Sequence, residues 1–187
     1  MAVALAIEED YSREELIDGE YMMAPAPSEG HNNITLNIAL LFRQYLRGKT
    51  CRAYGDNIDV FLDEKNIFRP DVSIVCDRSK IKANGIHGAP DLVVEILSIS
   101  TTKNDRGKKF KAYERCGVRE YWIVDPKNRS VEVYLNSADG FVLDNVYAMK
   151  NPPLAYDVTE PDPPTQIKVS LYEDFVVDVK DIFFDML

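Results

Sequence analysis

The sequence predicts one domain of the α/β or α+β class, in which helices flank a mixed β-sheet. Three observations predict this class. The chain has 187 residues, a usual length for one domain with a sizeable core. Its apolar residues follow helical and strand-like periods in the order helix, strands, helix, strands. No internal repeat or second-domain boundary is visible, so we expect residues 1–187 to form a single domain.

The composition is that of a soluble globular protein, with 45% apolar and 28% charged residues. No apolar run approaches the roughly 20 residues needed to span a bilayer, so we expect no membrane partner. The opening MAVALAIEEDYS lacks the basic start and the apolar length of a signal peptide. The net charge of −9 argues against nucleic-acid binding by the whole surface, but it allows a local basic groove.

The cysteines argue against a disulfide framework and against a zinc cluster. Cys51, Cys76 and Cys116 are odd in number, far apart in sequence and form no CxxC motif. We therefore expect a protein of the reducing cytoplasm.

The first third of the chain predicts a short helix, a link and a long helix. Residues 11–20 are charged and predict a short helix that leads into a turn at Gly19. Residues 24–30 form an irregular link with two prolines. A long amphipathic helix is predicted over residues 31–47, with Ser28 as its N-cap. Its apolar residues recur at steps of four, three and four: Ile34, Ile38, Leu41 and Tyr45.

The middle of the chain predicts three strands. Residues 54–62 and 67–76 read as two strands that the polar turn DEKN joins. Residues 81–90 contain two glycines and predict a loop. The strand at residues 91–97, DLVVEIL, is almost continuously apolar, which is typical of a central strand buried on both faces.

A second helix and more strands follow. The helix is predicted over residues 105–116, with Gly117 as its C-terminal stop. Residues 119–125 and 130–135 predict a hairpin, and residues 141–149 are a candidate for a further strand. Five prolines make residues 151–165 a predicted loop. The C-terminal stretch from residue 169 is expected to pack its Phe and Ile residues onto the domain.

The candidate site begins with Glu95, a carboxylate in the middle of an apolar strand. A buried charge is costly unless it is paired or binds a cation. Asp91 lies on the same strand face but about 13 Å away at 3.3 Å per residue, which is too far to share an ion. Asp71, at the start of the preceding predicted strand, is the natural partner. Two converging carboxylates repel each other unless a cation lies between them. Mg²⁺ or Mn²⁺ with oxygen ligands fits this pair and suits phosphodiester hydrolysis.

The predicted helix after this strand supplies positive charge. Residues 104–119 carry six basic side chains against only Asp105 and Glu114. Asp105, Lys109 and Tyr113 share one helical face, because residues four apart lie one turn above each other.

Three segments resemble a known family: RPDVSIV, GAPDLVVEILSISTTKNDRGKKFKAYERCGVREYWIVDP and VEVY. They are similar to the Uma-type restriction endonuclease family of the PD-(D/E)XK nuclease superfamily. The resemblance extends from IDGEYMMAPAPSEGHNN to about Tyr134, and more loosely to the C-terminal end. It implies a restriction endonuclease-like fold, in which helices flank a mixed sheet and the site lies at the mouth of the sheet.

The resemblance also implies roles for individual residues. Asp71 matches the aspartate of the Pro-Asp motif, and Glu95 matches the acidic residue of (D/E)XK, so both are implied metal ligands. Leu97 stands where the superfamily has its catalytic lysine, and Lys109 holds the matching position on the next helix. Pro90-Asp91 is a second Pro-Asp, so Asp91 is an alternative to Asp71. Glu29 is a candidate for an auxiliary acidic residue.

Structural alternatives stand beside these roles. Glu95 could pair with Lys109 or Arg106 as a buried structural acid. The role of Lys109 could be limited to an ion pair with Asp105, four residues earlier. Asp91 favours a structural role, and His31 favours a capping or surface role. The basic run of the helix is most often a solvated face. Tyr121 and Trp122 favour the core.

We therefore predict a metal-dependent endonuclease that acts on DNA, with Asp71, Glu95 and Lys109 as catalytic residues. The alternatives are an inactive member of the fold that binds nucleic acid or protein, and a phosphoesterase that acts on small substrates. The cleavage sequence, the choice of DNA over RNA and the oligomeric state stay open, with a homodimer as one alternative.

Overall fold

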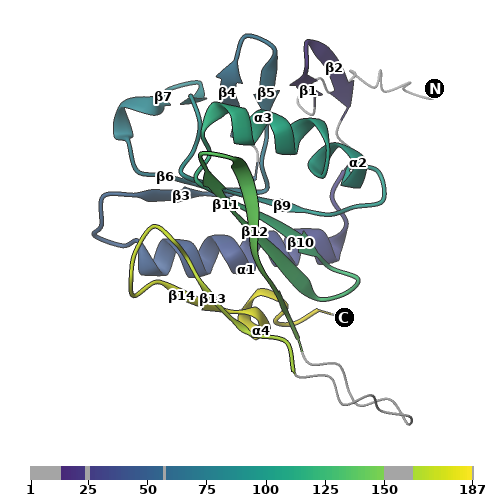
Figure 1. Cartoon of the computed structure of the whole chain (residues 1–187). Coiled ribbons are helices and arrows are strands. Elements are labelled where there is room, and N and C mark those ends of the chain that lie inside the picture. The colour runs from purple at the N-terminus through teal and green to yellow at the C-terminus, as the bar shows by residue number, and fades with distance from the viewer. Residues whose placement is uncertain (1–13, 24–25, 57, 150–161, 187) are drawn as a thin grey trace, which may run out of the picture.

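The computed structural model describes residues 14–23, 26–56, 58–149 and 162–186, and within them the chain combines helices with mixed β-sheets (Figure 1). The predicted fold class is confirmed. The strands of this part of the chain divide between two six-stranded sheets and a two-stranded ribbon, however, and not into the single sheet that the sequence predicted.

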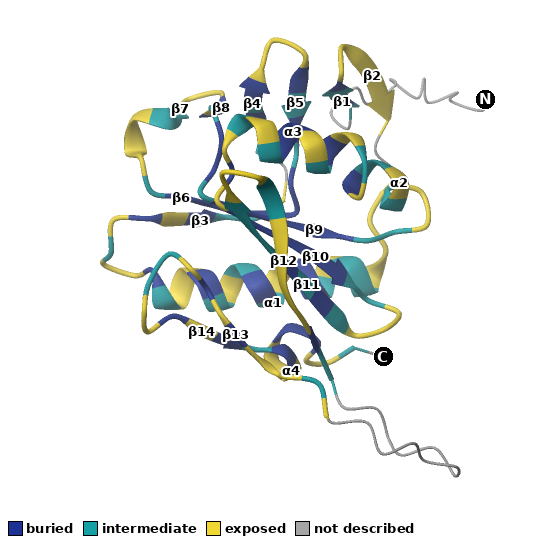
Figure 2. Cartoon of the chain, in the orientation of Figure 1, coloured by how far each residue is buried: buried dark blue, intermediate teal, exposed yellow. Residues whose placement is uncertain are grey.

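The central sheet has the strand order β12-β11-β10-β9-β6-β3. Strand β9 (Leu92–Ile96) runs parallel to β10 (Glu120–Asp125) and antiparallel to β6 (Val72–Val75). All five residues of β9 are buried, as predicted for a strand covered on both faces (Figure 2). The hairpin of β10 and β11 (Ser130–Ser137) is also confirmed, and β12 (Gly140–Ala148) extends it to the sheet edge.

Helices cover both faces of the central sheet (Figure 1). Helix α1 (Glu29–Tyr45) packs Ile34 and Ile38 into a core shared with Val94. Helix α3 (Lys108–Cys116) lies on the other face and packs Tyr113 into a second core. The two cores hold the two faces of β9, because successive strand residues point to opposite sides.

The second sheet packs into the same core as the buried face of α3 and has the order β2-β1-β5-β4-β8-β7. Its strands are short. They are β1 (Glu14–Ile17), β2 (Glu20–Met23), β4 (Val60–Asp63), β5 (Asn66–Phe68), β7 (Ile81–Lys82) and β8 (Gly85–His87).

The predicted short helix at residues 11–20 is wrong, because its described part belongs to the β1–β2 hairpin. Asp18 and Gly19 both have positive φ, 53° and 82°, and they form the two-residue turn. Positive φ at both positions gives a twist that matches antiparallel strands, and Asp-Gly is a preferred sequence for it. Strand alternation then buries Glu15 and Ile17 on one face.

The two strands predicted at residues 54–62 and 67–76 are each divided. The turn at Asp63–Asn66 is confirmed, but β4 and β5 beside it belong to the second sheet. The segment at the start of the first predicted strand, β3 (Arg52–Tyr54), pairs in the central sheet with β6, which forms the end of the second. Pro70 lies at the second break, between β5 and β6, where no strand hydrogen bond needs the N–H that proline lacks. The predicted loop at residues 81–90 contains the short strands β7 and β8.

The predicted helices need smaller corrections. The first is confirmed as α1, and Ser28 caps it by accepting a hydrogen bond from the His31 N–H at 3.2 Å. The second is divided at Gly107 into α2 (Thr102–Asp105) and α3. A Cβ at Gly107 would lie 2.5 Å from the Lys103 carbonyl oxygen, so the break requires glycine. Gly117 ends α3 with φ of 88°, as predicted.

The C-terminal segment packs onto the α1 side of the sheet. It forms the ribbon β13 (Gln166–Lys168) and β14 (Val176–Asp178) and a short helix α4 (Val179–Ile182). Phe175, Ile182 and Phe183 are buried, which confirms the expected packing, and Tyr121 and Trp122 are confirmed as core. Most of the predicted loop at residues 151–165 and the opening of the chain lie outside the described residues.

A disulfide joins Cys51 to Cys76, which corrects the expectation drawn from the cysteine spacing. Their 25-residue separation is misleading, because Arg52 pairs with Val75 across β3 and β6 and the next pair in this register is Cys51 with Cys76. Cys116 is free. Disulfides are typical of oxidising compartments, so the cytoplasmic location stays a prediction. None of the helices in the described part is long and apolar enough to cross a membrane.

Candidate active site

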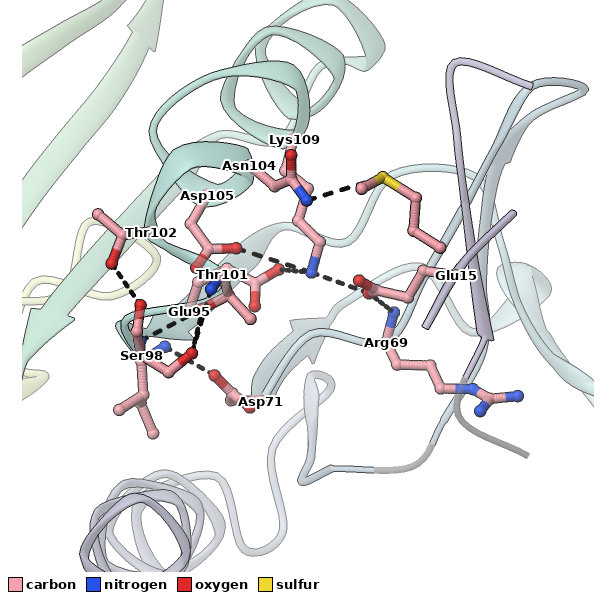
Figure 3. A network of polar contacts seen from close by, with 12 residues as sticks. Glu15, Arg69, Asp71, Glu95, Ser98, Thr101, Thr102, Asn104, Asp105 and Lys109 are labelled. Atoms are coloured by element: carbon pink, nitrogen blue, oxygen red, sulfur yellow. Dashed lines mark hydrogen bonds and ion pairs between the residues drawn. The ribbon is translucent and has the colours of Figure 1, made fainter. Parts of the chain in front are cut away.

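The candidate site is a buried cluster of charged side chains between the central sheet, the second sheet and α3 (Figure 3). Lys109 reaches into it from α3, Glu95 from β9, Glu15 from β1 and Asp105 from the end of α2. Each of these four residues is at most 7% exposed. Four charged groups so far from water must compensate one another or bind something that does.

Lys109 lies at the centre of this cluster. Its Nζ is 2.8 Å from Glu15 Oε1, 3.2 Å from Glu95 Oε1 and 3.8 Å from Asp105 Oδ1. The Tyr113 hydroxyl donates a hydrogen bond to the same Glu95 oxygen at 2.8 Å. Lys109 and Tyr113 therefore do share the helical face predicted for them, and that face meets Glu95. The ion pair of Lys109 with Glu95 that the structural alternative requires is also present.

Asp71 lies beside this cluster, immediately before β6. Continuing the register in which Val72 pairs with Val94 places Asp71 opposite Glu95 on the adjacent antiparallel strand. Directly opposite residues point to the same sheet face. Asp71 Oδ2 accepts a hydrogen bond from the Ile96 N–H at 2.6 Å, so its carboxylate is fixed to the peptide that follows Glu95.

His31 holds the other oxygen of Asp71. Its Nε2 is 3.2 Å from Asp71 Oδ1, and its Nδ1 is buried without a hydrogen-bond partner in the described residues. Burial is the largest single influence and opposes the charged imidazolium, but the hydrogen bond to Asp71, the Asp71 charge and smaller contributions together outweigh it and raise the pKa of His31 above its usual value. The sequence favoured a capping or surface role for His31. The structure shows that its side chain contacts a candidate metal ligand.

The cluster shifts the pKa values of its members. Burial raises the pKa of Glu95 well above its usual range, against the opposing effect of the Lys109 charge. Burial likewise raises the pKa of Asp105, to about 6. Burial opposes the charge of Lys109, but the Glu95, Glu15 and Asp105 carboxylates outweigh it and raise the pKa of the amine. Lys109 therefore stays charged, and the excess negative charge around it is relieved by protons or by a cation.

The donor set fits a hard divalent ion in part. Carboxylate oxygens are the ligands that Mg²⁺ and Mn²⁺ prefer, and neither oxygen of Asp105 accepts a hydrogen bond in the described part of the chain. No three His, Cys, Asp or Glu side chains among the described residues form a ready set of metal ligands. Asp71 and Glu95 would therefore supply two ligands, with water and phosphate oxygens as the others, which is usual for Mg²⁺.

The other acidic candidates lie outside the cluster. Asp91 accepts a hydrogen bond from the Cys76 N–H at 2.7 Å and lies 3.5 Å from an Arg119 nitrogen, so it joins the far end of β9 to its neighbours. Glu29 is exposed at the first position of α1. The acid that enters the cluster is instead Glu15, which the sequence analysis missed. The signal for it was the Asp18-Gly19 turn, since the hairpin places Glu15 on the buried face of its strand.

Much of the basic charge of residues 104–119, here called the second helical segment, is already paired. Arg106 pairs with Glu132 at 2.6 Å, Lys108 with Glu20 at 3.3 Å and Arg115 with Asp63 at 2.9 Å. These pairs are partly exposed and can exchange for phosphate contacts, because such ion pairs contribute little stability.

Comparisons with known proteins match this chain along most of its length. A family model described as "Uma2: Putative restriction endonuclease" matches residues 3–162. The uncharacterized protein slr1290 of Synechocystis sp. (strain ATCC 27184 / PCC 6803 / Kazusa) is 30% identical over 135 residues, which are 71% of each chain. A second protein of that organism, sll1609, is 26% identical over 136 residues, or 71% of this chain and 77% of its own.

A solved structure shares the fold. It is the crystal structure described as "a putative nuclease belonging to DUF820" from Anabaena variabilis ATCC 29413. It superimposes with a TM-score of 0.69 over 91% of this chain and 89% of its own, at 21% sequence identity.

Proposed function

The chain belongs to the Uma2 family, and on that premise we propose that it is a metal-dependent endonuclease that hydrolyses phosphodiester bonds in DNA. The observation that carries the proposal is the buried cluster around Lys109. Three carboxylates, those of Glu15, Glu95 and Asp105, lie within 4 Å of one ammonium group, and Asp71 lies beside them. This arrangement has an excess of buried negative charge that a divalent cation would neutralise.

In this proposal Asp71 and Glu95 hold Mg²⁺ or Mn²⁺. The bound ion would supply a water of lowered pKa and would neutralise charge on the phosphate. The protein holds both acids ready for this task, since the Ile96 N–H fixes Asp71 and the Tyr113 hydroxyl fixes Glu95. Fixed acceptors need no reorganisation when the reaction takes place.

Lys109 would orient the attacking water and stabilise the negative charge that develops on the phosphate. Its amine stays positive because three carboxylates surround it, and its position is fixed by two contacts at 2.8 and 3.2 Å. A buried, preorganised ammonium group interacts more strongly with developing charge than a solvated one. Lys109 thus supplies from α3 the positive group that Leu97 does not supply from the end of β9.

DNA is the substrate that the family description favours, and a homodimer would provide one such site for each strand of a duplex.

A second candidate function is that of an inactive member of the fold that binds a protein or nucleic acid. The paired basic side chains of the second helical segment and the net charge of −9 favour this alternative.

A cleavage assay separates the two functions. Purified protein is incubated with supercoiled plasmid and with single-stranded DNA at low salt, with Mg²⁺, Mn²⁺ or EDTA, and binding is measured in parallel. The endonuclease proposal predicts nicking that needs the metal and that Asp71→Asn abolishes while DNA binding persists. Binding without cleavage under any metal would leave the binding module as the function, and cleavage of small phosphodiesters alone would favour a phosphoesterase.

A further inference from the structure

Glu15 is a buried acid that neither the sequence motifs nor the metal-binding role accounts for. It lies on β1, far along the chain from the other members of the cluster, and it is 7% exposed. Its Oε1 accepts a hydrogen bond from the Arg69 N–H at 2.8 Å and lies 2.8 Å from Lys109 Nζ. This is a shorter contact to the lysine than the one made by Glu95 at 3.2 Å.

The two contacts of Glu15 connect separate parts of the site. Arg69 lies two residues before Asp71, in the segment that leads into β6. Lys109 lies on α3, which touches Glu95 on β9. One carboxylate oxygen therefore links the peptide just before the Asp71 position to the amine of the candidate catalytic lysine. The pairing of Leu16 with Ile67 holds side by side the two chain segments that carry Glu15 and Arg69.

The direction of these contacts matters for the lysine. Figure 3 shows the Lys109 amine between Glu15 on one side and Glu95 with Asp105 on the other. An ammonium group with only Glu95 and Asp105 as neighbours would move toward them and occupy the oxygens of Glu95 more fully. With Glu15 opposite, the amine is shared between the two sides, and Glu95 keeps electron pairs free for another ligand.

We infer that Glu15 is a positioning residue that fixes the Lys109 amine relative to Asp71 and Glu95, which makes the β1–β2 hairpin part of the active site. The inference rests on the proposed nuclease function for its effect on cleavage. The contacts themselves are independent of that function.

The test uses the full chain with Glu15→Gln, Glu15→Asp and the matched control Glu14→Gln. Glu14 is the preceding residue on the same strand, so its side chain points to the opposite face and its substitution changes the net charge equally. Glutamine at position 15 keeps an acceptor for the Arg69 N–H but loses the charge that holds the lysine. Aspartate keeps the charge and is one methylene shorter, so it serves where the glutamine variant fails to fold.

Two readouts are measured on these proteins. The first is kcat and KM for plasmid cleavage with Mg²⁺: Glu15→Gln should lower kcat by about 10–100-fold, as is usual for a residue that orients a catalytic or metal-binding group, with KM changed less than threefold. The second is the side-chain ammonium resonance of Lys109 in ¹H–¹⁵N spectra, assigned by its absence in Lys109→Ala. This signal should be protected from solvent exchange in the wild type and in Glu14→Gln, and it should be lost or shifted in Glu15→Gln.

The outcomes distinguish the inference from the proposed function. A wild type that cleaves no substrate would contradict the nuclease proposal, while the Lys109 resonance still decides whether Glu15 fixes the amine. An unchanged resonance and an unchanged kcat in Glu15→Gln would overturn the inference. So would equal changes in Glu15→Gln and Glu14→Gln, because a general effect of charge would then explain both.

Discussion

Replacing Lys109 with methionine removes the cation at the centre of the buried cluster and keeps most of the side-chain volume. The three carboxylates lie 2.8, 3.2 and 3.8 Å from its amine. At an effective dielectric constant of about 20, each attracts the amine by about 4–6 kcal/mol. The cost of removing these groups from water offsets most of that attraction. In proteins generally, removing one partner of a buried ion pair lowers the free energy of unfolding by about 3–5 kcal/mol. We expect a loss of this size in the free energy of unfolding at pH 8.

The loss should shrink as the pH falls. Burial already raises the pKa of Glu95, and that of Asp105 to about 6, and both rise further without the lysine charge. An acid with a higher pKa in the folded state contributes stability that is present below its unfolded pKa and is lost as the pH rises through its folded pKa. From pH 8 to pH 5 the deficit of Lys109→Met should therefore fall by up to about 1.4 kcal/mol per pH unit for each carboxyl that binds a proton.

Urea denaturation at pH 5 and pH 8, followed by circular dichroism, measures both effects. Lys111→Met is the matched control, because Lys111 is exposed on the same helix and its loss should change the stability by less than about 0.5 kcal/mol. Equal stability of the two variants at pH 8 would show that the ion pairs of Lys109 do not stabilise the fold. A deficit of the same size at both pH values would refute the part of the prediction that concerns proton binding.

Three further predictions concern the other members of the site. Millimolar Mg²⁺ should raise the melting temperature of the wild type by mass action, and Glu95→Gln should abolish most of this rise without destabilising the metal-free protein. Salt-matched thermal scans measure both effects, and an equal rise in the two proteins would contradict the prediction. The raised pKa of Asp105 should make the wild type less stable by about 1.4 kcal/mol per pH unit as the pH rises from about 4 to 6, and Asp105→Asn should not show this decline. Urea titrations at both pH limits should therefore give a flatter stability profile for the variant, and parallel profiles would contradict this. Lys109→Ala should reduce plasmid cleavage on the order of a hundredfold, and adding Leu97→Lys should restore part of the rate, since Leu97 packs in the same core as α3; no recovery would argue against a shared pocket.

Local patterns predicted the parts of the fold that depend on neighbouring residues. The period of Ile34 and Ile38 predicted α1, and the apolar run around Glu95 predicted the central strand β9. The contact of Glu95 with Lys109 follows from the family resemblance and from helical spacing, and the structure shows it directly.

The remaining features depend on strand pairing, which the period of the apolar residues does not specify. The division of the strands between two sheets arises because β3 pairs with β6 and β4 pairs with β5. The same register joins Cys51 to Cys76, although they are distant in sequence. Glu15 enters the site because the Asp18-Gly19 turn joins two strands into a hairpin, whereas the charge of residues 11–20 favoured a helix before that turn.

The most direct test of a metal-dependent site is a crystal structure with Mn²⁺, in which anomalous scattering locates the ion. The account predicts one strong anomalous peak within about 2.0–2.4 Å of a carboxylate oxygen of Asp71 and of Glu95, with water completing the coordination. It also predicts that the Lys109 amine stays beside Glu95 without contacting the ion. A structure at saturating Mn²⁺ with no peak between Asp71 and Glu95, and with Lys109 still the partner of Glu95, would contradict it.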